Sequence, residues 1–122
     1  MTSGNAHLQT GQIAEQTALA FLQSRGLELV EQNYSFKTGE IDIIMRDQDT
    51  LVFVEVRYRK SNRYGSGAES ITIAKRRRII NTAKHYLMKK KYTDQRCRFD
   101  VISASGQTNN GMKLDWIKSA FE

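Results

Sequence analysis

Two apolar segments of this chain carry acidic residues whose spacing could build an anionic pocket. The stretch from Gly39 to Lys60 reads GEIDIIMRDQDTLVFVEVRYRK and contains Glu40, Asp42 and Glu55. A carboxylate carried toward a protein core costs several kcal/mol unless its charge is compensated. The compensation could come from an arginine or from a hard divalent cation such as Mg²⁺ or Mn²⁺, which takes oxygen ligands.

The pocket would require two strands, joined by a tight turn at residues 47–49. Because side chains alternate between the two faces of a strand, the first strand should place Glu40, Asp42 and Ile44 on one face and Ile41, Ile43 and Met45 on the other. On the second strand one face should carry Phe53, Glu55, Arg57 and Arg59, and the other Val52, Val54, Val56 and Tyr58. A strand this apolar should lie inside a sheet.

The same residues carry a resemblance to known proteins. Asp42 followed by Glu55-Val56-Arg57 resembles the Asp…(Asp/Glu)-x-Lys pattern of the PD-(D/E)xK nuclease superfamily, with arginine where lysine is usual. Over about residues 10 to 120, four segments resemble in order those of the bacterial YraN family: GQIAEQTALAFLQSRG, NYSFKTGEIDIIMRD, LVFVEVRYRK and RCRFDVISA. That family is uncharacterised and is similar by pattern to archaeal Holliday-junction resolvases.

The resemblance implies an α/β fold with a restriction-endonuclease-like mixed β-sheet flanked by helices. It implies a single nuclease-like domain over residues 10–122, behind a disordered tail at 1–9. The implied activity is Mg²⁺- or Mn²⁺-dependent hydrolysis of DNA, on branched or processed intermediates, with a homodimer as one option. The implied catalytic residues are Glu15, Asp42, Glu55 and Arg57, and the implied metal ligands are Asp42, Glu55, the carbonyl of Val56, Glu15 and Glu40.

Arg57 departs from the superfamily pattern and leaves two functions open. Arginine stays protonated near neutral pH and cannot act as a general base. It could still hold the phosphate and neutralise developing charge, or catalysis could be lost while nucleic-acid binding remains. A third option is purely structural: Glu55 and Arg57 could neutralise each other on one strand face without any metal.

The remaining pattern predicts the element order α-β-β-β-α-β-β. We expect a helix over about 11–25 that stops at Gly26, a strand over 27–36, the hairpin, and a helix over about 72–91 capped by Ser70 or Thr72. Strands should follow over 97–104 and 111–118. Glu15 lies at the flank of its helix, where a half-exposed surface position is the alternative to the pocket. The buried stripe of the second helix should be Ile73, Ile79, Ile80, Ala83 and Leu87.

Positive charge is concentrated in one part of the chain. The net charge is +6, and fourteen of the 19 Lys and Arg lie between Arg57 and Arg98, beside only two acids. Such a layout suits binding of a polyanion such as DNA. The expected nucleic-acid contacts are Arg59, Lys60, Arg63, Tyr64, Lys75, Arg76 and Arg78. A solvated loop over 61–70 and a solvated helix face are the alternatives, and a scaffold that recruits another acidic partner is the third function class.

Several features limit the other possibilities. The amino terminus lacks the pattern of a signal peptide and no run approaches a membrane span, so we expect a cytoplasmic protein. A single cysteine, Cys97, excludes an internal disulfide and should serve packing. Asp100 should form a salt bridge or lie at the surface, and His85 should be a surface residue.

Overall fold

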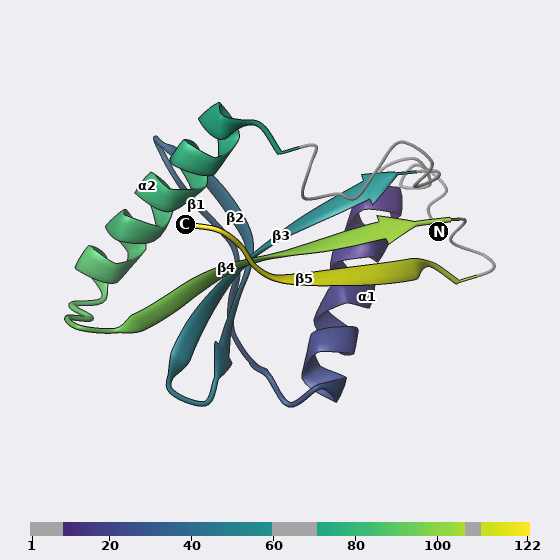
Figure 1. The fold of residues 1–122 in the computed structure, drawn as a ribbon, viewed down its shortest axis with the longest axis horizontal. Coiled ribbons are helices and arrows are strands. Elements are labelled where there is room, and N and C mark those ends of the chain that lie inside the picture. Colours follow the sequence, from purple (N-terminus) through teal and green to yellow (C-terminus); the bar gives the residue numbers. More distant parts are fainter. Residues whose placement is uncertain (1–8, 60–70, 107–110) are drawn as a thin grey trace.

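The computed structural model describes residues 9–59, 71–106 and 111–122 (Figure 1). The elements follow the predicted order: α1 (Gln9–Ser24), β1 (Glu28–Phe36), β2 (Gly39–Asp47), β3 (Thr50–Arg59), α2 (Ile73–Lys89), β4 (Arg96–Ser105) and β5 (Lys113–Phe121). The expected tail lies outside the described residues except for Gln9, which begins α1. Neither described helix combines the length and apolar character needed to cross a bilayer.

Five strands form one mixed sheet in the order β1-β2-β3-β4-β5. Neighbouring strands are antiparallel except β3 and β4, which run parallel and are connected through α2. The two helices cover opposite faces of the twisted sheet (Figure 1). The arrangement confirms the predicted mixed α/β fold, with the acidic hairpin of β2 and β3 inside the sheet.

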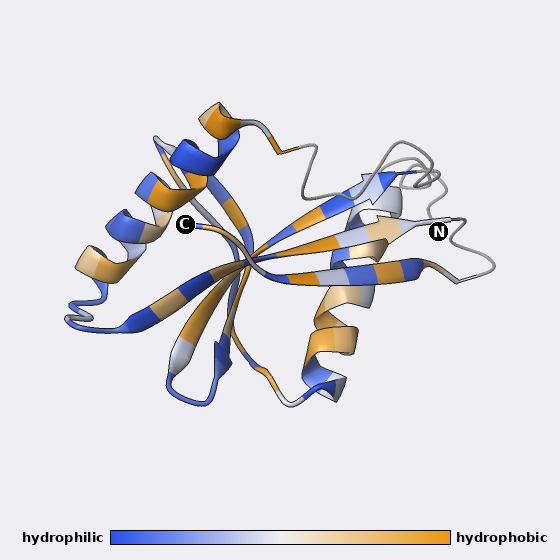
Figure 2. Ribbon diagram, viewed as in Figure 1, coloured by the Kyte–Doolittle hydropathy of each residue, from blue (hydrophilic) through white to orange (hydrophobic). Residues whose placement is uncertain are grey.

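The sheet has a hydrophobic core on each face. Figure 2 shows apolar residues along the middle of the central strands and at intervals along both helices. Under α1, Ala18 and Leu22 pack against Ile43 and Val54. Under α2 the buried cluster comprises Tyr34, Ile41, Ile44, Leu51, Phe53, Ile79, Ala83 and Tyr86. Val52 and Phe53 belong to opposite cores, which confirms the predicted alternation along β3.

The strict alternation of side chains between the two faces fails in β2 at Asp42. Ile41 lies in the core under α2 and Ile43 in the core under α1, so the prediction that they share a face was wrong. The break coincides with an irregularity in the neighbouring strand, where Asn33, between the paired residues Gln32 and Tyr34, has a left-handed φ of 54°. On its other side the ladder of β2 with β3 ends at the pair Ile43–Val54.

The buried face of α2 differs from the predicted stripe. Thr72 is the N-cap, as predicted, and its hydroxyl accepts the N–H of Lys75 at 3.1 Å. Ile73, however, is 65% exposed, because the first turn of α2 projects beyond the sheet core. Thr82 and Tyr86 are buried instead, since they share the i, i+3, i+4 and i+7 spacing that begins at Ile79.

His85 is not the surface residue that we expected. Its ring is half-buried and stacks on Phe36, with ring centroids 3.3 Å apart. Its Nδ1 lies 2.7 Å from the hydroxyl of Tyr34. This histidine therefore joins α2 to β1, an aromatic packing role that its isolated position in the sequence did not indicate.

Candidate functional site

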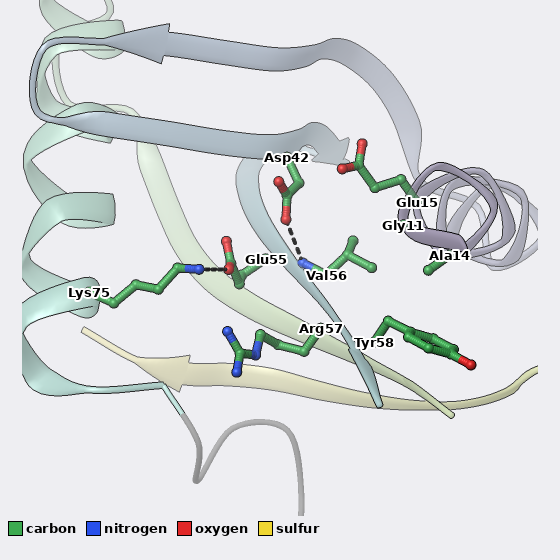
Figure 3. Close-up of a pocket in the computed structure, with 9 residues that line it drawn as sticks. All are labelled: Gly11, Ala14, Glu15, Asp42, Glu55, Val56, Arg57, Tyr58 and Lys75. Atoms are coloured by element: carbon green, nitrogen blue, oxygen red, sulfur yellow. Dashed lines mark hydrogen bonds and ion pairs between the residues drawn. The ribbon is translucent and has the colours of Figure 1, made fainter. Parts of the chain in front are cut away.

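A cavity of about 330 Å³ opens where α1, β2, β3 and α2 meet. The close-up in Figure 3 shows its lining side chains: Gly11, Ala14, Glu15, Asp42, Glu55, Val56, Arg57, Tyr58 and Lys75. Three acids from three different elements face this space, together with two cationic residues. The structure thus places Glu15, Asp42, Glu55, Val56 and Arg57 of the sequence prediction at one pocket.

Asp42 lies at the point where β2 separates from β3. Its Oδ2 accepts the backbone N–H of Val56 at 2.8 Å, where the ladder between the two strands has already ended. Burial, together with the nearby carboxylates of Glu55, Glu15 and Glu40, raises the pKa of Asp42 to about 7, although the hydrogen bond from Val56 acts to lower it. A cation in the pocket would therefore stabilise the charged form of this group.

Glu55 is the most buried acid of the pocket, with 6% of its side chain exposed. Its Oε2 lies 2.7 Å from the Nζ of Lys75, which reaches it from the first turn of α2. Lys75 was predicted only as one of several phosphate contacts. Its position beside Glu55 depends on the docking of α2, so the sequence alone gave no signal that singled it out among neighbouring cations.

Glu15 enters the pocket from α1, which carries two small residues on the same side. Gly11 and Ala14 also line the cavity, so the helix leaves open space next to the Glu15 carboxylate. Burial raises the pKa of Glu15, and the charges of Glu40 and Glu55 add to the effect. Glu40 itself is exposed and is absent from the lining, so it acts on the pocket through its charge rather than by contact.

Arg57 follows Glu55 by two positions on β3 and lines the same cavity. Within the described ranges, the Glu55 carboxylate makes its ion pair with Lys75 and not with Arg57, which argues against the predicted structural pair. The Nε of Arg57 is buried without a hydrogen-bond partner among the described residues. A buried N–H without an acceptor is costly, so an anionic ligand at this point would satisfy it.

The other expected nucleic-acid contacts are dispersed. Arg76 donates from Nε to the carbonyl of Ile71 at 3.1 Å and lies over the ring of Phe121, so part of its role is structural. Arg78 is exposed on α2, and Arg59 is half-buried at the end of β3. Three predicted residues lie outside the described residues: Lys60, Arg63 and Tyr64.

The pocket supplies the donor type that a hard divalent cation needs. Asp42 and Glu55 offer carboxylate oxygens beside the backbone of Val56, and the raised pKa of Asp42 reflects its burial and the neighbouring carboxylates. In the arrangement seen here, no three acidic, histidine or cysteine side chains of the described residues converge as a ready metal-binding group. Lys75 supplies the positive charge next to Glu55 in that arrangement.

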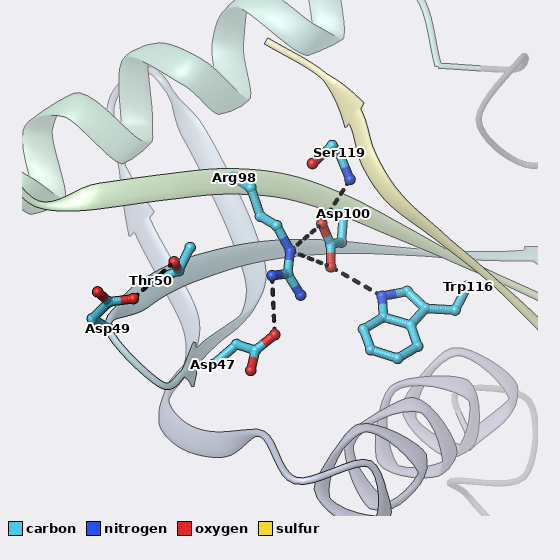
Figure 4. A network of polar contacts seen from close by, with 7 residues as sticks. All are labelled: Asp47, Asp49, Thr50, Arg98, Asp100, Trp116 and Ser119. Carbon is cyan, nitrogen blue, oxygen red and sulfur yellow. Dashed lines mark hydrogen bonds and ion pairs between the residues drawn. The ribbon is translucent and has the colours of Figure 1, made fainter.

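A second acidic cluster lies away from the pocket, where β4 meets β5 (Figure 4). Asp100 is fully buried, and both of its oxygens lie 3.1–3.2 Å from the Nε of Arg98. It also accepts the indole N–H of Trp116 at 2.9 Å and the backbone N–H of Ser119 at 3.0 Å. The guanidinium of Arg98 continues to Asp47 at 3.0 Å. This confirms the salt bridge expected for Asp100.

Comparison with known proteins gives one consistent result. Residues 14–104 match the family described as "Uncharacterised protein family UPF0102". A UPF0102 protein of Nitrosomonas europaea is 52% identical over 112 residues, which cover 92% of each chain. UPF0102 proteins of Pseudomonas savastanoi and Legionella pneumophila are 46% and 47% identical over 115 residues, which cover 93% of this chain and 94% and 95% of theirs.

Proposed function

We propose that this chain, which belongs to the uncharacterised protein family UPF0102, the YraN family that its sequence resembles, is a metal-dependent endonuclease that hydrolyses phosphodiester bonds of DNA. The observation that carries the proposal is the meeting of Glu15, Asp42 and Glu55 with Arg57 and Lys75 in one cavity (Figure 3). A buried acid such as Asp42, whose pKa is raised to about 7 by desolvation and by neighbouring carboxylates, is a common feature of reactive sites.

The carboxylates of Asp42 and Glu55, with the carbonyl of Val56, would hold a Mg²⁺ or Mn²⁺ ion. When bound, the ion would polarise the phosphoryl oxygen and make a water more acidic. Glu15 would add a ligand or orient the attacking water from the α1 side of the cavity. Glu40, which is exposed, would contribute only its charge.

Arg57 would take the phosphate-binding role and not the role of a base. Its buried Nε–H has no partner within the described part of the chain, and a guanidinium can donate two parallel hydrogen bonds to phosphate oxygens. Fixed donors of this kind stabilise the charge that builds up as the phosphodiester reacts. An enzyme with arginine at this position would then rely on the cation for acidity of the water.

The positive charge of α2 supports a polyanionic substrate. Lys75 in its first turn lines the cavity, and further basic residues follow along the helix to Lys89 in its last turn. Neutralised phosphates release counterions, so the affinity for DNA should fall steeply as the salt concentration rises. Branched or processed DNA intermediates are the substrate class that we favour.

The test is cleavage of labelled single-stranded, duplex, flapped and four-way-junction DNA with Mn²⁺, Mg²⁺ or EDTA. We expect cleavage with either metal and none with EDTA, and a loss of at least about 100-fold in Asp42→Asn and Glu55→Gln. Asp49→Asn, an exposed acid in the neighbouring turn, is the matched control and should retain activity. Cleavage that persists in both pocket variants would overturn the proposal.

One observation favours a second function, a nucleic-acid-binding module without catalysis. The ion pair of Lys75 with Glu55 neutralises the most buried acid of the pocket without any metal. In that case no substrate would be cleaved, and salt-sensitive DNA binding would survive Asp42→Asn and Glu55→Gln. The same set of proteins therefore separates the two functions.

A further inference from the structure

We infer that Lys75 is an exchangeable counter-ion of Glu55: it leaves the carboxylate when a divalent cation binds and then contacts the phosphate of the substrate. The inference rests on the proposed function and adds to it a residue from a different element, because the sequence pattern pointed to Arg57 for this task. The observations that carry it are the position of Lys75 in α2, the burial of its partner and the geometry of the cavity.

The position of Lys75 is unfavourable for the helix. With Thr72 as N-cap, Lys75 is the third residue of α2, where a capping box would place Glu or Gln. The first turn has no acidic residue, and a cation at this end opposes the helix macrodipole. The charge of Lys75 therefore does not stabilise the helix. The group that stabilises this charge lies outside the helix, at Glu55.

The buried Glu55 carboxylate requires a compensating cation, whereas the Lys75 ammonium can move into solvent. The Glu55 side chain is 6% exposed, and a buried carboxylate requires a cation nearby. The Lys75 side chain is 36% exposed, so its ammonium can return to water without a large desolvation penalty. Its backbone is fixed by the cap hydrogen bond from Lys75 N to Thr72 Oγ1, which leaves the four-carbon side chain as the moving part.

A divalent cation held by Asp42 and Glu55 would replace Lys75 electrostatically. Two positive groups cannot share the Glu55 oxygen that now lies 2.7 Å from Nζ without repulsion. The displaced ammonium would remain at the rim of the cavity, which Arg57 also lines. Lys75 and Arg57 would then bind phosphate oxygens together, so that the site gains phosphate-binding charge only after the metal is bound.

The test is calorimetric titration of Mn²⁺ into wild-type protein and two variants of opposite effect. Lys75→Met removes the competitor, so the affinity for Mn²⁺ should rise roughly fivefold, the scale of a half-exposed ion pair. Lys75→Arg offers a forked donor that holds a carboxylate more firmly, so the affinity should fall. Lys84→Met, at an exposed position of the same helix, is the control and should bind as the wild type does.

Cleavage of DNA, measured on the same proteins, separates the two proposals. We expect Lys75→Met to bind Mn²⁺ more tightly and yet cleave more slowly, a combination that a merely structural lysine would not produce. Unchanged or weaker Mn²⁺ binding by Lys75→Met would overturn the inference even if the wild type is an active nuclease. Tighter binding by Lys75→Met with no cleavage by any protein would support the exchange and reject the nuclease.

Discussion

Asp42 and Asp100 are carried by strands of the same sheet, but only one of them is fully partnered. Asp100 receives Arg98, the indole of Trp116 and the backbone of Ser119, so each of its oxygens has donors (Figure 4). Among the described residues, Asp42 accepts one hydrogen bond, from Val56, and has three acids nearby that raise its pKa (Figure 3). The comparison teaches that burial alone does not distinguish the two carboxylates, since they differ in how far neighbouring donors compensate their charge.

The largest expected effect tests the fully partnered side of this comparison. Asp100→Asn leaves the half-buried guanidinium of Arg98 with Asp47 alone, so the free energy of unfolding should fall by about 3–5 kcal/mol. Urea denaturation measures the change. The exposed Asp49→Asn, in the turn between β2 and β3, should stay within about 0.5 kcal/mol of wild type. A loss below about 1 kcal/mol in Asp100→Asn would remove the distinction between the two sites.

The next largest effect is an increase in the free energy of unfolding, expected when Asp42 is replaced. The folded-state pKa of Asp42 is about 7, above its ordinary value of 3.8, so the folded protein binds this proton more tightly than the unfolded chain does. Without metal, the contribution of this group to stability should therefore be fully present below about pH 4 and be lost as the pH rises toward 7. Asp42→Asn keeps an oxygen acceptor for Val56 and lacks this decline, so at pH 8 it should be roughly 2–4 kcal/mol more stable than wild type.

The measurement is urea denaturation in EDTA across pH 4 to 8. Asp49→Asn should follow the wild-type curve, because its carboxylate is exposed. If Asp42→Asn lost stability at pH 8, as Asp100→Asn should, the Asp42 carboxylate would be a structural group. The two carboxylates would then not differ in how far their charge is compensated.

A smaller loss of stability should follow when one hydrogen-bond donor to Asp100, the indole of Trp116, is removed. Trp116→Phe removes one hydrogen bond to a carboxylate and keeps an aromatic ring against Phe21, which now packs edge to face at 5.9 Å. We expect a loss of about 1.5–3 kcal/mol. In the Asp100→Asn background most of this loss should disappear, since directly interacting residues are not additive. Full additivity in the double-mutant cycle would show that the hydrogen bond from the indole to Asp100 does not contribute to stability.

The smallest effect is a change in acidity at the pocket. Glu55→Gln removes one of the charges that raise the pKa of Asp42 and releases Lys75 beside it. Both changes favour the Asp42 carboxylate, so its pKa should fall below about 7. A carboxyl-detected NMR titration in EDTA would follow this group directly. An unchanged pKa would mean that burial alone, without crowding of acids, accounts for its behaviour.

Much of the fold could be predicted because the relevant signals are local. The apolar run of β3, the hairpin turn, Gly26 after α1 and the Thr72 cap each depend on a few neighbouring residues. The failures concern tertiary effects. Ile41 lies on the unexpected face at a point where Asn33, on the neighbouring strand, has a left-handed φ.

The candidate site shows the same division. The acids of the hairpin and Glu15 followed from their residue types and from the resemblance, and the structure brings them to one cavity. Lys75 could not be singled out, because its meeting with Glu55 depends on how α2 docks beside β3. His85 was misjudged for a similar reason, since Phe36 and Tyr34 come from a distant strand.

The order in which the pocket is assembled has a consequence for folding kinetics. Asp42 and Glu55 belong to adjacent strands of one hairpin, whereas Lys75 arrives only when α2 has packed and β4 has paired in parallel with β3. Local pairings form faster than pairings that close long loops. The two acids should therefore approach each other before their counter-ion is present, so that refolding is slowed by their repulsion. We expect the refolding rate to be higher at pH 5 than at pH 8, and this difference to vanish in Asp42→Asn.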